Sequence, residues 1–169
     1  MENLVENISK SVAIELLFEE MPTRPTANAI FREARKIFGD INIINRDEND
    51  IEFSVDKFVA YNEDNTTSPV VLAMGNITDF DDKVAVSEFE RTQIWNVANS
   101  EELLSKYKYA VKIWDVNAQR QIPKERAIML VDWLNVALKL YPKCQAIWIK
   151  SAGKLQLAQS IKNLKETGI

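Results

Sequence analysis

The 169-residue sequence contains no histidine and a single cysteine, Cys144. Histidine is the commonest general base and the commonest transition-metal ligand, so its absence removes both roles. One cysteine without histidine cannot supply the usual zinc ligands, a Ser-His-Asp triad or a Cys-His nucleophile. We therefore predict no metal site and no cofactor, and we expect any catalysis to use carboxylate, arginine and lysine side chains.

Targeting and membrane-spanning signals are also lacking. One cysteine forms no intrachain disulfide, whereas small secreted proteins more often carry paired cysteines. The start, Met1-Glu-Asn-Leu4, lacks the basic and apolar regions of a signal peptide. No apolar run approaches the roughly 20 residues that cross a bilayer. We therefore expect a cytoplasmic protein that does not bind membranes, with Cys144 as a small buried filler.

The composition is that of an ordinary globular protein. Hydrophobic residues make up 46% of the chain and charged residues 27%, which argues against disorder. The length lies within the usual range of about 100–200 residues for one domain. We therefore predict a single domain over residues 1–169.

Charge is distributed unevenly along the chain, whose net charge is −4. Residues 1–98 carry 9 Lys and Arg against 19 Asp and Glu, a balance of −10, and residues 99–169 carry 12 against 6, a balance of +6. The acidic total disfavours nucleic acid as a partner, because phosphates attract a basic surface. Two interpretations of the asymmetry stay open: attraction between the two parts within one fold, or a dipolar surface that docks a protein partner.

Apolar periodicity predicts an α+β fold with a mixed or mostly antiparallel sheet flanked by helices. Period-two patterns predict strands over residues 11–18, 40–45, 51–61, 69–77, 107–116 and 145–150. Helical spacing and capping residues predict helices over residues 27–38, 87–95, 100–106, 123–141 and 157–166, with Thr26 as the cap of the first and Pro123 as the first residue of the fourth. Strand–helix–strand occurs over 11–45 and again over 107–150, which is compatible with an internal duplication.

The stretch Ser151-Ala-Gly-Lys154 lies between a predicted strand and a predicted helix, as a phosphate-binding loop would. A Walker A motif would require glycine at Trp148 and Ser or Thr at Leu155, so the nucleotide-binding loop is excluded. Ser151, Gly153 and Lys154 remain candidate anion-binding residues near a helix N-terminus. The alternative is a plain turn that leads into the helix.

Asp79-Phe-Asp-Asp82, followed by Glu90, has the outline of a calcium loop. An EF-hand would require an oxygen ligand at Lys83 and glycine at Val84. Both requirements fail, so we expect a solvated loop without a bound metal.

Asp115 ends a predicted strand, and Arg126 lies in the first turn of the next helix. The simplest interpretation is a salt bridge that braces this connection. The alternative is a polar candidate pocket that Asp115 and Arg126 share with Glu90 and Arg91. Glu15, on the face of its strand between Ala13 and Leu17, is expected to be exposed or paired; a half-buried carboxylate with a raised pKa would be a candidate acid catalyst.

The four tryptophans are predicted to lie in the core. Any that proves exposed would be a first candidate for a binding hot spot, because tryptophan is enriched among residues that dominate binding energy. They are Trp95, Trp114, Trp133 and Trp148.

Several short stretches occur together in one order: Ala13-Ile-Glu-Leu-Leu-Phe-Glu-Glu-Met-Pro22, Phe38-Gly-Asp40, Glu90-Arg-Thr-Gln-Ile-Trp95, Pro123-Lys-Glu-Arg-Ala127, Tyr141-Pro-Lys-Cys-Gln-Ala146 and Ser151-Ala-Gly-Lys154. In this combination the chain resembles a bacterial family of unknown activity, the domain of unknown function 4261, over nearly its whole length. The resemblance implies a bacterial cytosolic protein. It supplies no activity and no catalytic residues.

Two functions are compatible with these observations. The first is a non-catalytic protein that binds a protein partner, in a regulatory or toxin-neutralising role, favoured by the missing histidine and the uneven charge. The second is an enzyme that acts on a small anionic substrate with carboxylate, arginine and lysine groups. Its candidate residues are Glu90, Arg91, Asp115, Arg126 and Lys154. The sequence leaves the oligomeric state open.

Overall fold

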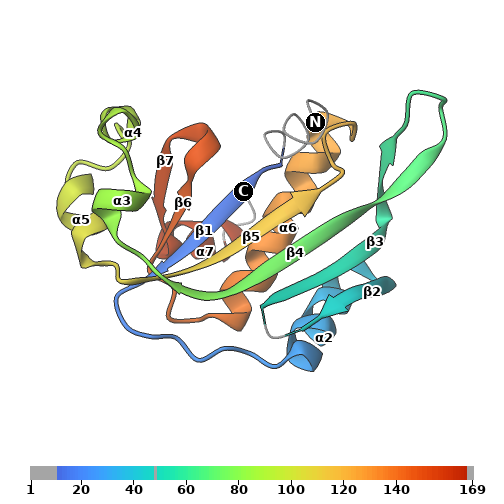
Figure 1. Ribbon diagram of the computed structural model, residues 1–169, viewed down its shortest axis with the longest axis horizontal. Coiled ribbons are helices and arrows are strands. Elements are labelled where there is room, and N and C mark those ends of the chain that lie inside the picture. The colour runs from blue at the N-terminus through green and yellow to red at the C-terminus, as the bar shows by residue number, and fades with distance from the viewer. Residues whose placement is uncertain (1–10, 48, 167–169) are drawn as a thin grey trace. The chain divides into compact units, whose positions relative to one another are not determined.

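The protein is an α+β structure with an open antiparallel sheet, as a computed structural model of residues 11–47 and 49–166 shows (Figure 1). The seven strands lie in the order β2-β3-β4-β5-β1-β6-β7. They are β1 (Ala13–Phe18), β2 (Ile41–Arg46), β3 (Asp50–Tyr61), β4 (Thr67–Asp79), β5 (Tyr109–Val116), β6 (Ala146–Ile149) and β7 (Lys154–Leu157). The predicted fold class is confirmed.

Six α-helices occur among the described residues. They are α2 (Ala27–Phe38), α3 (Asp82–Ala85), α4 (Glu88–Gln93), α5 (Ser100–Lys106), α6 (Pro123–Leu140) and α7 (Ala158–Glu166). Within this described part of the chain, no helix is both long enough and apolar enough to cross a bilayer.

The two predicted strand–helix–strand segments exist, but they connect the sheet differently. Strands β5 and β6 both neighbour β1, whereas β2 lies four positions from β1 in the strand order. The strand order therefore gives no support to an internal duplication.

The chain divides into two compact units that interleave along the sequence. Unit 1 comprises residues 1–12, 25–76 and 113–140, and unit 2 comprises residues 13–24, 77–112 and 141–169. By sequence, unit 1 carries 10 Lys and Arg against 14 Asp and Glu, a balance of −4, and unit 2 carries 11 of each, a balance of zero. The two parts of the sequence differ strongly in charge, with balances of −10 and +6, but the two structural units differ much less. A single domain over 1–169 stays a prediction.

The core of unit 1 is built on aromatic contacts between α2, α6 and β3. Phe31 and Phe53 meet edge to face at 6.1 Å between ring centroids, and Phe53 meets Trp133 in the same way at 5.2 Å. The Trp133 indole N–H donates to the backbone oxygen of Ala73 at 3.1 Å, so the largest side chain of this core is also satisfied as a donor. Thr26 caps α2 as predicted, since its hydroxyl accepts from the backbone N–H of Ala29.

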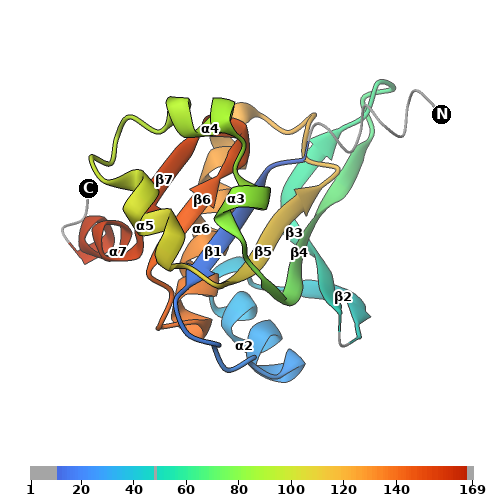
Figure 2. The ribbon, with the colours of Figure 1, turned by 60° about the vertical axis from the view of Figure 1, so that its left-hand side comes forward.

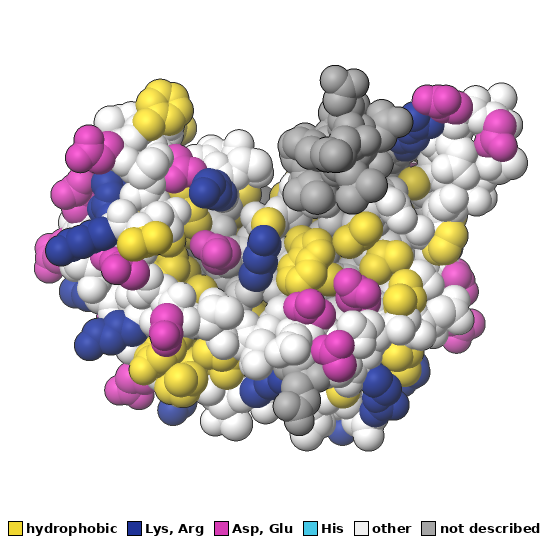
Figure 3. Space-filling model, in the orientation of Figure 1, with side chains coloured by type: hydrophobic (Ala, Val, Ile, Leu, Met, Phe, Trp, Pro, Cys, Tyr) yellow, Lys and Arg dark blue, Asp and Glu magenta, His cyan; other side chains and the backbone are white. Residues whose placement is uncertain are grey.

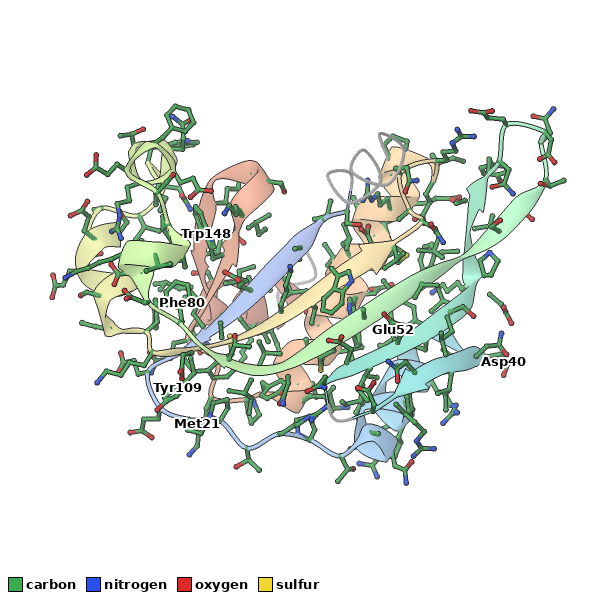
Figure 4. The ribbon with its side chains drawn as sticks, viewed as in Figure 1. Met21, Asp40, Glu52, Phe80, Tyr109 and Trp148 are labelled. Atoms are coloured by element: carbon green, nitrogen blue, oxygen red, sulfur yellow. The ribbon has the colours of Figure 1, made fainter. Side chains whose placement is uncertain are left out.

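In unit 2, the helices α3, α4 and α5 lie over one face of β1, β6 and β7 (Figure 2). The antiparallel register pairs Glu15 of β1 with Trp148 of β6, and Trp148 in turn with Leu155 of β7. The buried residues that fill this layer come from both the strands and the short helices; Phe80 and Trp148 are labelled in Figure 4. They are Leu17, Phe80, Val86, Ile94, Leu104, Tyr107, Ala110, Ala146, Trp148 and Leu155.

A cationic cluster surrounds Glu33 on α2. Its carboxylate lies 2.8 Å from the ammonium group of Lys139 on α6 and 2.8 Å from that of Lys36. These hydrogen bonds, that of Lys139 first, lower the pKa of Glu33 from 4.5 to about 2. The folded state therefore holds Glu33 ionised at pH values at which the unfolded chain has taken up a proton.

We expect Glu33→Gln to lower the free energy of unfolding at pH 7, by an amount that shrinks as the pH falls. A depressed pKa contributes stability above about pH 4.5 that is lost between there and about pH 2. Urea unfolding of both proteins at pH 7, 5 and 3 measures the difference. Glu102→Gln, which removes an exposed ion pair 3.9 Å long, is the matched control. A Glu33→Gln effect that stays constant with pH would contradict this assignment.

Candidate functional site

Asp115 and Arg126 form a buried bidentate ion pair in unit 1. The guanidinium Nε of Arg126 donates to Oδ2 of Asp115 at 2.7 Å, and Nη2 donates to Oδ1 at 2.9 Å. The backbone N–H of Val12 donates to the same Oδ1 at 2.9 Å. The predicted salt bridge is confirmed. Since both carboxylate oxygens are engaged and the side chain of Asp115 has no exposed surface, this aspartate acts as a brace between β5, α6 and the residue that precedes β1.

We expect Asp115→Asn to lower the free energy of unfolding by about 3–5 kcal/mol, because it removes the negative charge that faces the mostly buried guanidinium of Arg126. The control is Arg120→Gln, which breaks the exposed pair with Glu63 and should change stability by roughly 0–1 kcal/mol. Urea denaturation of the three proteins measures both values. Equal effects of the two substitutions would show that the buried pair is not the brace described here.

Glu90 and Arg91 are neighbours on α4, yet each engages a different partner in unit 2. Glu90 accepts from the backbone N–H of Ser87 at 2.8 Å in a reciprocal capping box, and this hydrogen bond lowers its pKa. Arg91 donates to Asp82, at 3.0 Å to the carboxylate and 2.7 Å to the backbone oxygen. Both residues thus hold the short helices together.

The four candidate pocket residues separate into two pairs. Glu90 and Arg91 belong to unit 2, whereas Asp115 and Arg126 belong to unit 1. A pocket that all four share stays a prediction.

Residues 151–154 do not lie at a helix N-terminus. Ser151 belongs to a short 3-10 turn, Gly153 adopts a left-handed conformation with φ +58°, and Lys154 begins strand β7. The helix starts only at Ala158. The structure has a turn here, but the strand β7 lies between this turn and the helix, because Leu155 and Leu157 extend a β-hairpin with β6. The prediction of an anion site at Ser151, Gly153 and Lys154 relied on a nearby helix N-terminus, and the structure has none at these residues.

The β6–β7 hairpin instead holds the end of α4. A Cβ atom on Gly153 would lie 3.0 Å from Cβ of Gln93 and would push it away by a few tenths of an ångström, and the positive φ of Gly153 also favours glycine. The side-chain amide of Asn96 donates to the backbone oxygen of Leu155 at 2.7 Å. Lys150 lies 3.5 Å from the carboxylate of Glu90. These contacts fix α4 and the residues that follow it on the hairpin.

Two tryptophans are core residues as predicted, since Trp133 and Trp148 have no exposed surface. The core prediction is wrong for Trp95, which is 83% exposed. The preceding residue, Ile94, is buried in the layer beneath α4 and forms a tight turn, in which the backbone N–H of Trp95 donates to the backbone oxygen of Gln93 at 3.1 Å. Trp114 is partly buried.

Two further apolar side chains on the same short helices are exposed. Val84 on α3 is 83% exposed, and Phe89 on α4 is 74% exposed. Full burial of a side chain of this size would stabilise the fold by about 1.5–3 kcal/mol, and this stabilisation is absent while the side chain is in water. With Trp95, three large apolar side chains are thus exposed within twelve residues of the chain.

An open hollow of about 760 Å³ lies between α3, α4 and α5. Its lining includes the buried Val86 and two hydroxyl groups, those of Thr92 and Ser105. Acidic and hydrophobic side chains lie close together over this part of unit 2 in Figure 3. The charged residues of the lining are Asp82, Lys83, Glu88, Arg91 and Glu101. We call the hollow, together with Val84, Phe89 and Trp95, the α3–α5 surface.

Glu15 is half-buried. Among the described residues, its carboxylate forms no ion pair with an ammonium or guanidinium group. Burial raises its pKa, and the charges of Lys112 and Lys150 oppose that rise. The β1–β6 register puts its side chain on the same face as that of Trp148, whose indole N–H is buried and has no hydrogen-bond partner in the described chain. Glu15 therefore matches the alternative of a half-buried carboxylate.

Cys144 is buried, and burial raises its pKa to about 12. Its thiol donates to the backbone oxygen of Ala146 at 3.2 Å. The thiolate is thus disfavoured, which agrees with the predicted role as a filler. Across residues 11–47 and 49–166, no three acidic or cysteine side chains lie close enough together to share a metal ion.

Comparisons with protein-family models, curated proteins and solved structures find no match to this chain. The resemblance to the domain of unknown function 4261 therefore stays a prediction.

Proposed function

We propose that this chain is a non-catalytic protein that binds a protein partner through the α3–α5 surface, in a regulatory or toxin-neutralising role. The observation that carries the proposal is Trp95, which is 83% exposed next to the buried Ile94. Tryptophan is among the residue types most enriched in binding hot spots, and Phe89 adds a second exposed aromatic group six residues earlier.

The charged candidates for catalysis support binding over an enzyme. Asp115 is saturated by Arg126 and Val12, and Glu90 by its capping box and Lys150. A general acid or base requires a free site within reach of a substrate, which these hydrogen bonds occupy. We expect this binding to take place in the cytoplasm, in keeping with the single buried thiol of Cys144.

Glu15 favours the second candidate, an enzyme that acts on a small anionic substrate. Its pKa is raised by burial, and two lysines, Lys112 and Lys150, act on it electrostatically. Lysines attract anions, and a carboxyl group with a raised pKa is suited to donate a proton.

We expect the double variant Phe89→Ala/Trp95→Ala to lose its partner while it stays folded. The test is capture of the tagged protein from lysate of its own organism with mild crosslinking, followed by measurement of the purified partner's affinity. Loss of one hot-spot residue should weaken binding by about 30-fold, and loss of both by more, because hot-spot residues each contribute about 2 kcal/mol or more. Thermal unfolding should be unchanged, since both side chains are already exposed.

The matched control is Ile128→Ala/Val131→Ala, which removes two exposed apolar side chains from α6 in unit 1. It should keep full affinity. A partner that binds the aromatic variant as tightly as the natural chain, or that is lost equally from the control, would refute the proposal.

A further inference from the structure

The segment that carries the exposed aromatic side chains is strongly acidic. Residues 79–102 contain seven Asp and Glu against two cations, Lys83 and Arg91, a balance of −5. Part of this charge is compensated locally, since Asp82 pairs with Arg91, Glu90 with Lys150, and Glu102 with Lys106.

Two of the carboxylates on the hollow are not compensated. Glu88 on α4 and Glu101 on α5 are exposed, and neither has an ion-pair partner among the described residues. Asp82, the third acidic residue of the lining, is occupied by Arg91. The lining has two cations, Lys83 and Arg91. Arg91 pairs with Asp82, whereas Lys83 forms no ion pair among the described residues. The hollow therefore presents two open carboxylates beside a buried apolar residue, Val86, and two hydroxyl groups.

Phe89 shares α4 with Glu88, and Trp95 follows the residue that caps this helix. Phe89 directly follows Glu88 on α4, and Thr92, which lines the hollow, lies one turn further and donates its hydroxyl to the backbone oxygen of Phe89 at 2.6 Å. A partner seated on Phe89 and Trp95 would thus extend over Glu88. Its charge must oppose that of the segment, because like charges held at an interface oppose association.

We propose that the partner presents a basic amphipathic segment: an apolar side chain against Phe89 and Trp95, and a Lys or Arg side chain in the hollow between Glu88 and Glu101. Arg suits such a site well, since its planar guanidinium combines hydrogen bonding to a carboxylate with stacking on an aromatic ring. This inference rests on the proposed function and names the chemistry of the partner. Lys83, at the edge of the same hollow, opposes the incoming cation and limits affinity.

The test uses two synthetic amphipathic peptides of about 14 residues that share their apolar positions, one with Arg and Lys on its polar face and the other with Glu. Amide chemical shifts of the ¹⁵N-labelled full chain report where each binds. We expect the basic peptide to shift the amides of Glu88–Trp95, Glu101 and Ser105 and the acidic peptide to leave them unchanged. Affinity should fall with added salt, since screening shortens the reach of exposed charges.

Three charge variants make the test specific. Glu88→Gln/Glu101→Gln should weaken the basic peptide about threefold to tenfold, as expected for two partly exposed ion pairs. Lys83→Gln should strengthen binding by a small factor. Glu102→Gln, which removes an equal charge from α5 outside the lining of the hollow, should have little effect.

The inference is overturned if the basic peptide gives no localised shifts, or if Glu102→Gln weakens it as much as the pair Glu88→Gln/Glu101→Gln. It is also overturned if a second copy of this chain proves to be the occupant, seen as a dimer in sedimentation that Trp95→Ala dissolves. A natural partner that requires Phe89 and Trp95 but is indifferent to salt and to Glu88 and Glu101 would refute this inference while leaving the proposed function intact.

Discussion

The three short helices of unit 2 depend on the buried side chains that anchor them. Helices of four, six and seven residues are too short to be stable alone in water, since nucleation costs more than so few hydrogen bonds return. Leu104 of α5 and the residues that close α3 and α4, Val86 and Ile94, enter the layer above β1, β6 and β7. Everything that the α3–α5 surface presents follows from this anchoring. Trp95 directly follows the buried Ile94 and lies exposed.

Local polar contacts also fix the positions of the short helices that the buried side chains anchor. The capping box of Ser87 and Glu90 starts α4, and the Arg91–Asp82 pair ties α4 to α3. The close approach of Gly153 to Gln93 then fixes the end of α4 on the hairpin. Charged groups that resembled a catalytic set in the sequence are used for this purpose, as Asp115 and Arg126 are in unit 1. Such a surface is largely preformed, which lowers the entropic cost of binding.

Patterns within single elements were enough to predict most of the fold. The period-two strands, the Thr26 cap of α2 and Pro123 as the first residue of α6 all follow from local chemistry, as does the Asp115–Arg126 pair across one short connection. The prediction failed where tertiary packing decides. Lys154–Leu157 is too short to show a strand pattern beside a helix, and Trp95 lies next to Ile94 with nothing local to say which of the two is buried. The clustering of carboxylates around the hollow requires three helices to meet, so spacing alone could not indicate it.

The most direct test of this account is native-state hydrogen exchange of the backbone amides in α4 and α5. If buried anchors hold these helices in place, the amides of Arg91, Ile94 and Leu103, which donate to Ser87, Arg91 and Asn99, should exchange at least about a hundredfold more slowly than in an unstructured chain. Exchange at nearly unstructured rates, with normal protection in β1 and β6, would contradict it. The exposed tryptophan would then belong to a mobile segment, and no preformed binding surface would exist.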